Sequence, residues 1–178
     1  MDIVTAQHGD RWDLAAVAAA TFPLACPPSA APEDIAAFIA ANLSAHCFAE
    51  YVSDPARAVL AATDAGQIVG YAMLVREAGD RPDGPGSVPH RPAVELSKMY
   101  VLPDYHGTGA ATALIRSGIG WACQRGARVV WLGVNQKNER AQRFYRKQGF
   151  EVSGIRSFRL GASLEEDFVM VRSLAGAV

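Results

Sequence analysis

The feature that most constrains the fold is a strand, a glycine-containing turn, a helix and a second strand in direct succession. Val94–Leu102 is rich in apolar and β-branched residues and ends at Pro103. Gly109–Arg125 has apolar residues at helical spacing, and Gly126 is a typical C-terminal cap. Arg128–Val134 is a nearly continuous apolar run, as expected for a buried central strand. Strands and helices alternating in this way predict an α/β domain.

The rest of the chain extends this unit on both sides. Further strands are predicted over residues 2–7, 58–63, 67–76, 150–160 and 167–174, and further helices over 10–22, 33–53 and 139–148. Pro23 is expected to end the first helix. The Gly- and Pro-rich stretch 78–92 is predicted to be a mobile loop within the domain. A length of 178 residues suits a single domain over 1–178.

The net charge of −1 conceals two regions of opposite sign. Residues 1–104 contain 13 Asp and Glu against 6 Lys and Arg, whereas residues 105–160 contain 2 against 10. A basic C-terminal region suits a polyanionic ligand, and an acidic N-terminal region suits a cationic one. Segregated solvated faces would give the same counts. The chain as a whole is not basic and has no recognition motif for nucleic acid, so a nucleic-acid partner is not expected.

Cysteine, histidine and apolar patterns exclude several other classes. The three cysteines are widely spaced without a C-x-x-C pair, and the four histidines have no metal-ligand spacing, so no metal is predicted. Reduced thiols indicate the cytoplasm. No apolar run approaches the roughly 20 residues of a membrane helix, so no membrane partner is expected.

The turn between the strand and the helix carries the chemistry. It consists of His106, Gly107, Thr108, Gly109, Ala110 and Ala111. Glycines at such a turn expose consecutive backbone N–H groups, which form an anion site together with the helix N-terminus. A P-loop has no match in the chain. A Rossmann turn would require a third glycine where Thr112 stands, and an acid near the end of the next strand, where Asn135 stands.

This turn resembles the coenzyme A loop of the GNAT acetyltransferase superfamily, which reads [QR]-x-x-G-x-[GA]. The chain has His106-x-x-Gly109-x-Ala111, with histidine in place of Gln or Arg. One strand later, Asn138-x-x-Ala141-x-x-x-Tyr145-x-x-x-Gly149-Phe150 resembles the superfamily's second cofactor motif. The resemblance implies a GNAT fold: a mixed sheet of about seven strands and about four helices, with strands four and five splayed around acetyl-CoA.

A narrower resemblance concerns the acceptor and the assembly. Glu95-Leu96-x-Lys98-x-Tyr100-Val101-Leu102 and Ser157-Phe158-x-Leu160-Gly161 are similar to the bacterial PaiA-type spermidine/spermine N-acetyltransferases. This implies a small-molecule amine acceptor, namely a polyamine. An acetyltransferase for a protein N-terminus or a drug amine, and a non-catalytic acyl-CoA-binding module, remain alternatives. Because many superfamily members are dimers, the resemblance also implies a homodimer.

The resemblance assigns roles along the cofactor. Tyr145 would protonate the departing thiolate, although it could instead be a core tyrosine beside Phe144. Asn138 would hydrogen-bond the cofactor, or simply cap its helix. Lys147 would reach a phosphate of the ADP moiety. The pantetheine arm would lie along Met99, Tyr100 and Val101, and Gly133 on the next strand would allow close backbone approach.

The acceptor amine must lose a proton before it attacks, since an alkylammonium has a pKa of about 10.4. Glu95 is the predicted base, directly or through water; a salt bridge to a lysine or arginine is the alternative. Strict strand alternation would place Glu95 with Ser97 and Met99, opposite Lys98. Further acids that could hold a cationic substrate are Glu50, Asp54, Glu165, Glu166 and Asp167.

Overall fold

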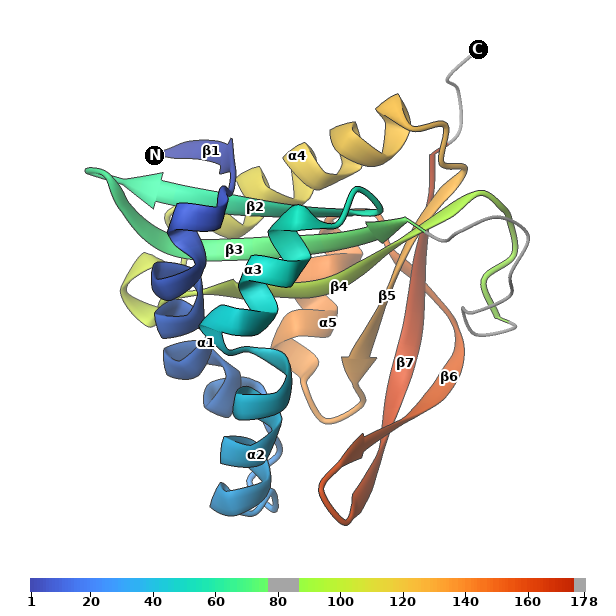
Figure 1. The fold of residues 1–178 in the computed structure, drawn as a ribbon. Helices are drawn as coiled ribbons and strands as arrows, with labels where there is room; N and C mark the ends of the chain where they lie inside the picture. Colours follow the sequence, from blue (N-terminus) through green and yellow to red (C-terminus); the bar gives the residue numbers. More distant parts are fainter. Residues whose placement is uncertain (77–86, 175–178) are drawn as a thin grey trace.

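The computed structural model of the 178-residue chain describes residues 1–76 and 87–174. One seven-stranded sheet has the order β1-β2-β3-β4-β5-β7-β6 (Figure 1). Its strands are β1 Asp2–Thr5, β2 Arg57–Asp64, β3 Gln67–Arg76, β4 Ala93–Val101, β5 Val129–Asn135, β6 Glu151–Leu160 and β7 Ser163–Ser173. Only β4 and β5 pair in parallel among these strands, so the sheet is mixed, as predicted.

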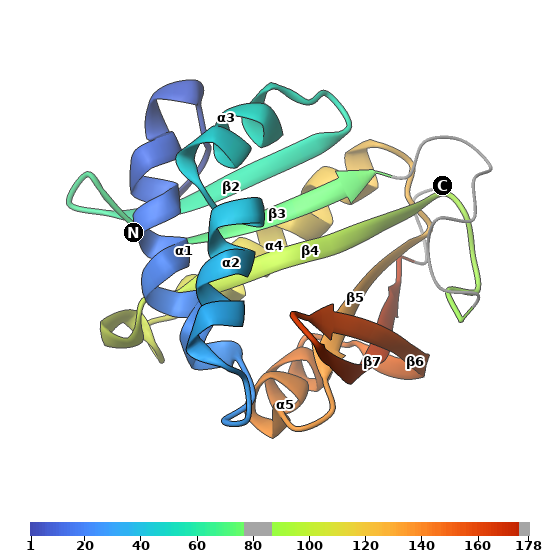
Figure 2. The same ribbon diagram turned by 60° about the horizontal axis from the view of Figure 1, so that its bottom comes forward.

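Helices cover both faces of the sheet. Two of them lie on one face, α4 Ala110–Gln124 and α5 Glu139–Lys147, and the others lie on the opposite face, α1 Arg11–Ala25, α2 Pro32–Asn42 and α3 Ala45–Ser53 (Figures 1 and 2). The α/β class and the GNAT-type arrangement predicted from the sequence are confirmed. The described structure has five α-helices where about four were expected.

The additional helix arises because the predicted helix 33–53 is wrong as one element. Leu43 ends α2, and Ser44 begins α3 as its N-cap, with its hydroxyl oxygen accepting a hydrogen bond from the Cys47 N–H at 3.3 Å. A serine side chain that satisfies a free N–H in this way favours a new helix start over continuation of the old helix. The prediction that Pro23 ends α1 is also wrong, since the helix runs to Ala25.

The break between α2 and α3 also bears on the membrane question. The segment Pro32–Ser53 is long and apolar enough, by length and composition alone, to cross a membrane. In the fold, however, it consists of helices of 11 and 9 residues. Each is much shorter than the roughly 20 residues that a membrane-spanning helix requires.

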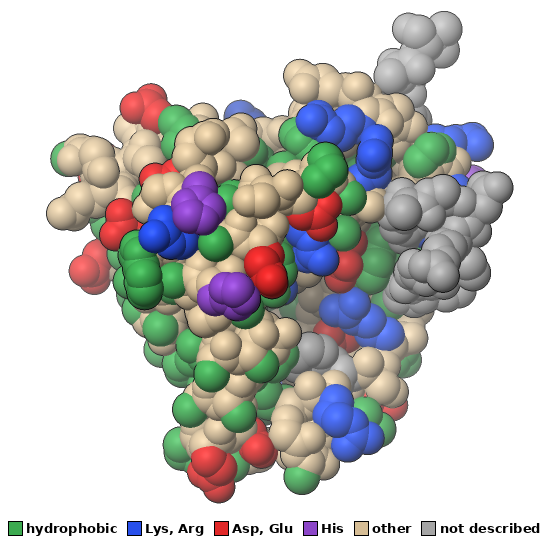
Figure 3. Space-filling view, in the orientation of Figure 1, with side chains coloured by type: hydrophobic (Ala, Val, Ile, Leu, Met, Phe, Trp, Pro, Cys, Tyr) green, Lys and Arg blue, Asp and Glu red, His purple; other side chains and the backbone are tan. Residues whose placement is uncertain are grey.

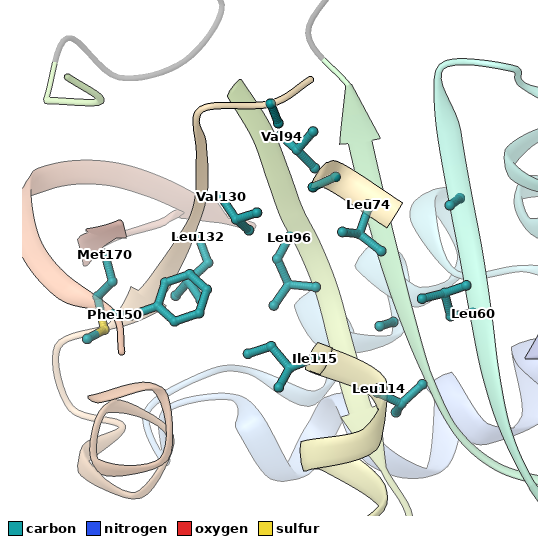
Figure 4. Packing of buried hydrophobic residues seen from close by; sticks show 14 of the residues in the cluster. Leu60, Leu74, Val94, Leu96, Leu114, Ile115, Val130, Leu132, Phe150 and Met170 are labelled. Atoms are coloured by element: carbon teal, nitrogen blue, oxygen red, sulfur yellow. The ribbon is translucent and has the colours of Figure 1, made fainter. Parts of the chain in front are cut away.

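Two apolar layers hold the helices on the sheet. The layer beneath α4 brings together Leu74 of β3, Leu96 of β4 and Leu132 of β5 with Leu114 and Ile115 of the helix (Figure 4). A second layer, beneath α1 and α3, contains Leu14, Phe22, Phe48, Val59, Tyr71 and Met73. The sheet is therefore buried on both faces, which fixes β4 in its centre.

A β-bulge in β4 changes which side chains share a face. Leu96 pairs with Leu74 and Lys98 pairs with the preceding residue, Met73, so Ser97 is an extra residue without a partner on β3. A bulge of this kind reverses the alternation beyond it. The prediction of strict alternation is therefore wrong for two residues: Lys98 lies on the Glu95 face, and Met99 packs with Leu96 in the layer beneath α4.

Beyond the bulge, the sheet splits. Strands β4 and β5 pair only at Ala93–Glu95 and Val129–Trp131, and then diverge (Figure 2). On its other side, β5 stays paired with β7 from Val129 to Asn135. The splaying of strands four and five implied by the resemblance is confirmed, and it leaves backbone groups of both strands unpaired across the opening.

Candidate active site

Two cavities meet at the split between β4 and β5. The first, called here the loop-side cavity, has a volume of about 410 Å³ and lies among the turn after β4, the start of α4 and α5. The second, the strand-side cavity, has a volume of about 510 Å³ and lies among α1, α2, the β4 bulge and strands β5 to β7. The two cavities share six of their lining residues: Ala25, Met99, Tyr100, Asn138, Ala141 and Tyr145.

The loop-side cavity is built mainly from backbone at the start of α4. Gly107 and Gly109 have φ angles of 83° and 95°, in the left-handed region that glycine adopts without strain. The first backbone hydrogen bond of the helix runs from the Ala113 N–H to the Gly109 carbonyl at 2.9 Å. The N–H groups of residues 110–112 precede that bond and have no partner within the helix. With the positive end of the helix dipole, they form an anion site.

The predicted loop residues do not all face this cavity. Its lining includes His106, Gly107, Gly109 and Ala111, whereas Ala110 is fully buried in the core beneath the helix. The Thr108 hydroxyl donates a hydrogen bond to the Tyr105 carbonyl at 2.8 Å and closes the turn. Of the predicted cofactor residues, Thr108 and Ala110 could therefore contact a cofactor only through their backbone atoms.

His106, the position that departs from the superfamily pattern, holds the turn in place. Its Nε2 atom is 2.9 Å from the Val101 carbonyl, so the ring donates a hydrogen bond to the end of β4. The imidazole therefore connects the turn to the last residue of the strand beside the split. A role in positioning the turn follows from this contact.

Helix α5 brings Asn138 and Tyr145 to the junction of the cavities. The Asn138 side chain accepts a hydrogen bond from the Ala141 N–H at 3.1 Å and caps the helix. Tyr145 packs against Phe144 and Phe150, with ring centroids 5.4 and 5.9 Å away. Burial raises the pKa of Tyr145 to about 12, so its phenol is protonated at neutral pH. Tyr145 is both a packed aromatic residue and a wall of both cavities.

Lys147 lies apart from this junction. It is in the last turn of α5, its side chain is exposed, and it lines neither cavity. The structure therefore does not bring Lys147 together with the other predicted cofactor residues. A contact would need a ligand that extends beyond the loop-side cavity.

Charged side chains from distant strands form the strand-side cavity. Arg156 of β6 lies across β5, with its Nη1 atom 3.4 Å from Oε1 of Glu95 and its Nε atom 3.5 Å from Oδ2 of Asp167. The guanidinium carbon is 5.4 Å from the centre of the Trp131 ring. Acidic and basic side chains accordingly lie close together around the hollow between the helices and strands β6 and β7 (Figure 3). The ion-pair alternative for Glu95 is thus observed.

The absence of a side chain at Gly133 leaves room for the Arg156 side chain. A Cβ atom on Gly133 would lie 2.2 Å from Nη2 of Arg156, which is far inside van der Waals contact. The close approach predicted at Gly133 is real, but the group that approaches is this side chain. Sequence reasoning missed Arg156, and the glycine in a central strand was the one signal that something must pass over it.

Two more acids complete the cavity wall. Glu165 is bound by Lys137 at 3.1 Å and by the Asn135 amide at 3.4 Å, and these hydrogen bonds lower the pKa of its carboxyl. Burial raises the pKa of Asp167, and Arg156 opposes this shift. Glu165 and Asp167 therefore join the site as predicted acids, whereas Glu50, Asp54 and Glu166 do not line either cavity.

Comparison with known proteins identifies the chain. The profile described as "Acetyltransferase (GNAT) family" matches residues 20–150, which contain the whole loop-side cavity. The chain belongs to the GNAT acetyltransferase family. The match ends before Arg156, Glu165 and Asp167, so part of the strand-side cavity lies outside it.

Individual GNAT relatives support this assignment over nearly the full length. An uncharacterised N-acetyltransferase of Mycobacterium tuberculosis is 60% identical over 165 residues, which cover 93% of this chain and 98% of the relative. The solved PaiA N-acetyltransferase of Thermoplasma acidophilum, in complex with coenzyme A, has a TM-score of 0.77 at 20% identity and covers 97% of this chain and 98% of its own. The ribosomal-protein-alanine N-acetyltransferase of Brucella melitensis has a TM-score of 0.70 at 23% identity, with 98% and 100% coverage.

Membership settles the reaction class. The protein is an acetyl-CoA-dependent N-acetyltransferase of the GNAT type. The Rossmann alternative is thereby excluded. The solved relatives named above are similar in fold alone, since their identities lie below 25%.

Proposed function

We propose that the protein acetylates a primary amine by direct attack on acetyl-CoA in a ternary complex. The observation that carries this proposal is that Tyr145 lines both cavities at the point where they meet. The donor would occupy the loop-side cavity and the acceptor the strand-side cavity. Their reacting ends would then meet beside one phenol without a covalent enzyme intermediate.

The loop-side cavity fits coenzyme A in its chemistry. The free N–H groups at the start of α4 suit the pyrophosphate. The edge of β4 from Met99 to Val101 that faces away from β3 does not pair with β5, and it suits the amides of the pantetheine arm, because strand-like hydrogen bonds can form there. Asn138 borders the same cavity. Lys147 lines neither cavity, and its proposed contact with a phosphate of the ADP moiety requires that this moiety extend beyond the loop-side cavity.

Two side chains are assigned to proton transfer. When bound, acetyl-CoA supplies an activated acetyl group on a sulfur leaving group. Tyr145 is the proposed acid for that sulfur, and its raised pKa keeps the proton available at neutral and alkaline pH. Glu95 is the proposed base for the acceptor ammonium, directly or through water. Arg156 holds the Glu95 carboxylate and is proposed to orient it.

Several amine acceptors are consistent with this chemistry. The PaiA resemblance suggests polyamines, and the structural similarity to a ribosomal-protein-alanine N-acetyltransferase makes a protein N-terminus the second acceptor to test. A drug amine is the third. Cys26, Cys47 and Cys123 form no disulfide, which supports the proposed cytoplasmic location. A homodimer is proposed on family resemblance.

Thiol release from acetyl-CoA tests the proposal. Wild-type protein is mixed with polyamines, peptides and aminoglycosides, and a rise in free thiol with any of them supports acetyl transfer. Tyr145→Phe at saturating acetyl-CoA should lose most of this turnover. Tyr51→Phe is the matched control, because Tyr51 lines neither cavity. Binding of acetyl-CoA without turnover on any acceptor would instead support the non-catalytic module.

A further inference from the structure

The charges of the strand-side cavity pair off almost completely. Arg156 is shared between Glu95 and Asp167, at 3.4 and 3.5 Å. Glu165 is bound by Lys137 at 3.1 Å. Each of the three carboxylates that line the cavity is therefore in contact with a cation, although Glu95 and Asp167 share the same one. A polycation that entered the cavity would have to compete with Arg156 and Lys137 for these carboxylates in order to offset the loss of its hydration.

Lys98 is the exception among these charges. The β4 bulge turns it onto the Glu95 face, where it lines the strand-side cavity. Within residues 1–76 and 87–174, no carboxylate lies within 4.0 Å of its ammonium. The Nζ atom instead lies 5.5 Å from the centre of the Tyr51 ring. The ring attracts the cation but does not neutralise it.

The surroundings compensate this ammonium only in part. Burial lowers the pKa of Lys98, and the nearby Arg57 lowers it further, although Glu95 opposes both. Arg57 is itself satisfied, because its Nε atom donates to Asp54 at 2.9 Å. A partly buried cation beside an open cavity costs free energy unless an anion joins it.

We infer that the acceptor is an amino-carboxylate, a molecule that carries a carboxylate as well as the reacting amine, and that Lys98 binds the carboxylate. This inference rests on the proposed function, in which the strand-side cavity receives the acceptor. Lys98 is a specificity-determining residue in this scheme. A carboxylate would give Lys98 the anionic partner that it lacks, whereas a polyamine would place a further positive charge next to it.

Acceptors of matched length provide the test. The series compares ω-amino carboxylates of two to six carbons, and L-lysine, with the alkylamines and diamines that lack only the carboxylate; spermidine is included. Turnover is followed as thiol release, and binding to the coenzyme A-loaded enzyme is followed separately as a shift in melting temperature. At least one carboxylate acceptor should have a kcat/KM about tenfold or more above that of its matched amine, as expected for a charge-assisted contact.

Variants of Lys98 locate the effect. Lys98→Met should remove this preference by raising KM for the carboxylate acceptor, with little change for the matched amine. Lys98→Arg should retain much of it. Arg143→Met is the control, since Arg143 pairs with Glu139 on the surface of α5 and lines neither cavity. Equal melting temperatures for the unliganded variants would show that all of them fold.

The possible outcomes distinguish the inference about Lys98 from the proposed acetyl transfer. Spermidine or a diamine preferred over every carboxylate acceptor, or a preference that Lys98→Met leaves unchanged, would overturn the inference while acetyl transfer stands. Carboxylate-dependent binding that needs Lys98, without thiol release for any acceptor, would support the inference and overturn the proposed function. Absence of any carboxylate preference in both assays would overturn the inference.

Discussion

The loop-side and strand-side cavities share a wall but are built in different ways. The loop-side cavity uses backbone N–H groups, two glycines with positive φ and one helix start, which come from adjacent residues. The strand-side cavity uses charged side chains from three strands: Glu95 and Lys98 of β4, Arg156 of β6, and Glu165 and Asp167 of β7. Backbone N–H groups bind anions whatever side chains surround them. The ligand preference of a cluster of charged side chains, in contrast, changes with each substitution. The difference teaches that the cavity proposed for the donor is fixed by the fold, whereas the cavity proposed for the acceptor is fixed by individual residues.

The largest effect is expected where the two cavities meet. Tyr145→Phe should lower kcat by roughly 10²–10⁴-fold, the usual contribution of a positioned general acid. The KM for acetyl-CoA should change little, because the ring and its packing on Phe150 remain. Steady-state kinetics with acetyl-CoA saturating would check this. Full turnover in the variant would remove Tyr145 as the acid and with it the functional link between the cavities.

A substitution at Gly109 should affect the loop-side cavity alone. Gly109→Ala places a side chain at φ 95°, which costs roughly 1–2 kcal/mol if the turn is kept and displaces the N–H donors if it relaxes. The KM for acetyl-CoA is expected to rise about tenfold while the acceptor KM stays constant. Gly120→Ala in α4 is the control, because a Cβ at Gly120 meets open space and φ there is not positive. A rise in the acceptor KM of similar size would contradict the separation.

A substitution at Gly133 should affect the strand-side cavity alone. Gly133→Ala would force Arg156 away, so the acceptor kcat/KM should fall severalfold and the protein lose about 1–3 kcal/mol from overpacking. Acetyl-CoA affinity should be retained. In an Arg156→Met background, the same change should have a much smaller effect, because a thioether stem replaces the guanidinium. Equal effects in both backgrounds would show that Arg156 is not the group in conflict.

The smallest effect is expected in the pH dependence of the stability of the protein. Charged side chains line the strand-side cavity, and their titration should change the free energy of unfolding. Burial raises the pKa of Asp167, so the folded protein holds this proton more tightly than the unfolded chain does. The Asp167 contribution to stability therefore falls as pH rises from the ordinary carboxyl pKa through the raised one. Denaturant unfolding at several pH values should show wild type losing stability relative to Asp167→Asn over that range. The opposite trend would mean that the attraction of Arg156 outweighs burial.

Local sequence patterns predicted some of the helices correctly and others wrongly. Periodicity located α4 and α5 nearly to the residue, because each helix has apolar residues on one continuous face. The same periodicity ran through Leu43 and Ser44 and predicted one helix where there are two. A serine that caps a new helix has the same side chain as one in the middle of a helix. Whether it caps is decided by how the two helices pack on the sheet.

The sequence by itself determined the loop-side cavity, the proposed donor half of the site. The turn 106–111 and the motif from Asn138 to Tyr145 are contiguous, and a backbone anion site follows from local conformation. Loop residues 78–86, predicted to be mobile, lie outside the described residues. Prediction therefore reached the family, the fold class and acetyl-CoA from short segments of chain.

Only the tertiary structure decided the strand-side cavity, the proposed acceptor half. One extra residue in β4 placed Lys98, and not Met99, on the face of Glu95. The packing of β5 against β7 and of β7 against β6 brought Arg156 over Gly133 to a carboxylate 61 positions earlier in the chain. No local pattern encodes these contacts, because a bulge reverses strand alternation without a sequence marker and sheet order brings distant residues together. The charge balance of the acceptor cavity is therefore a property of the folded sheet.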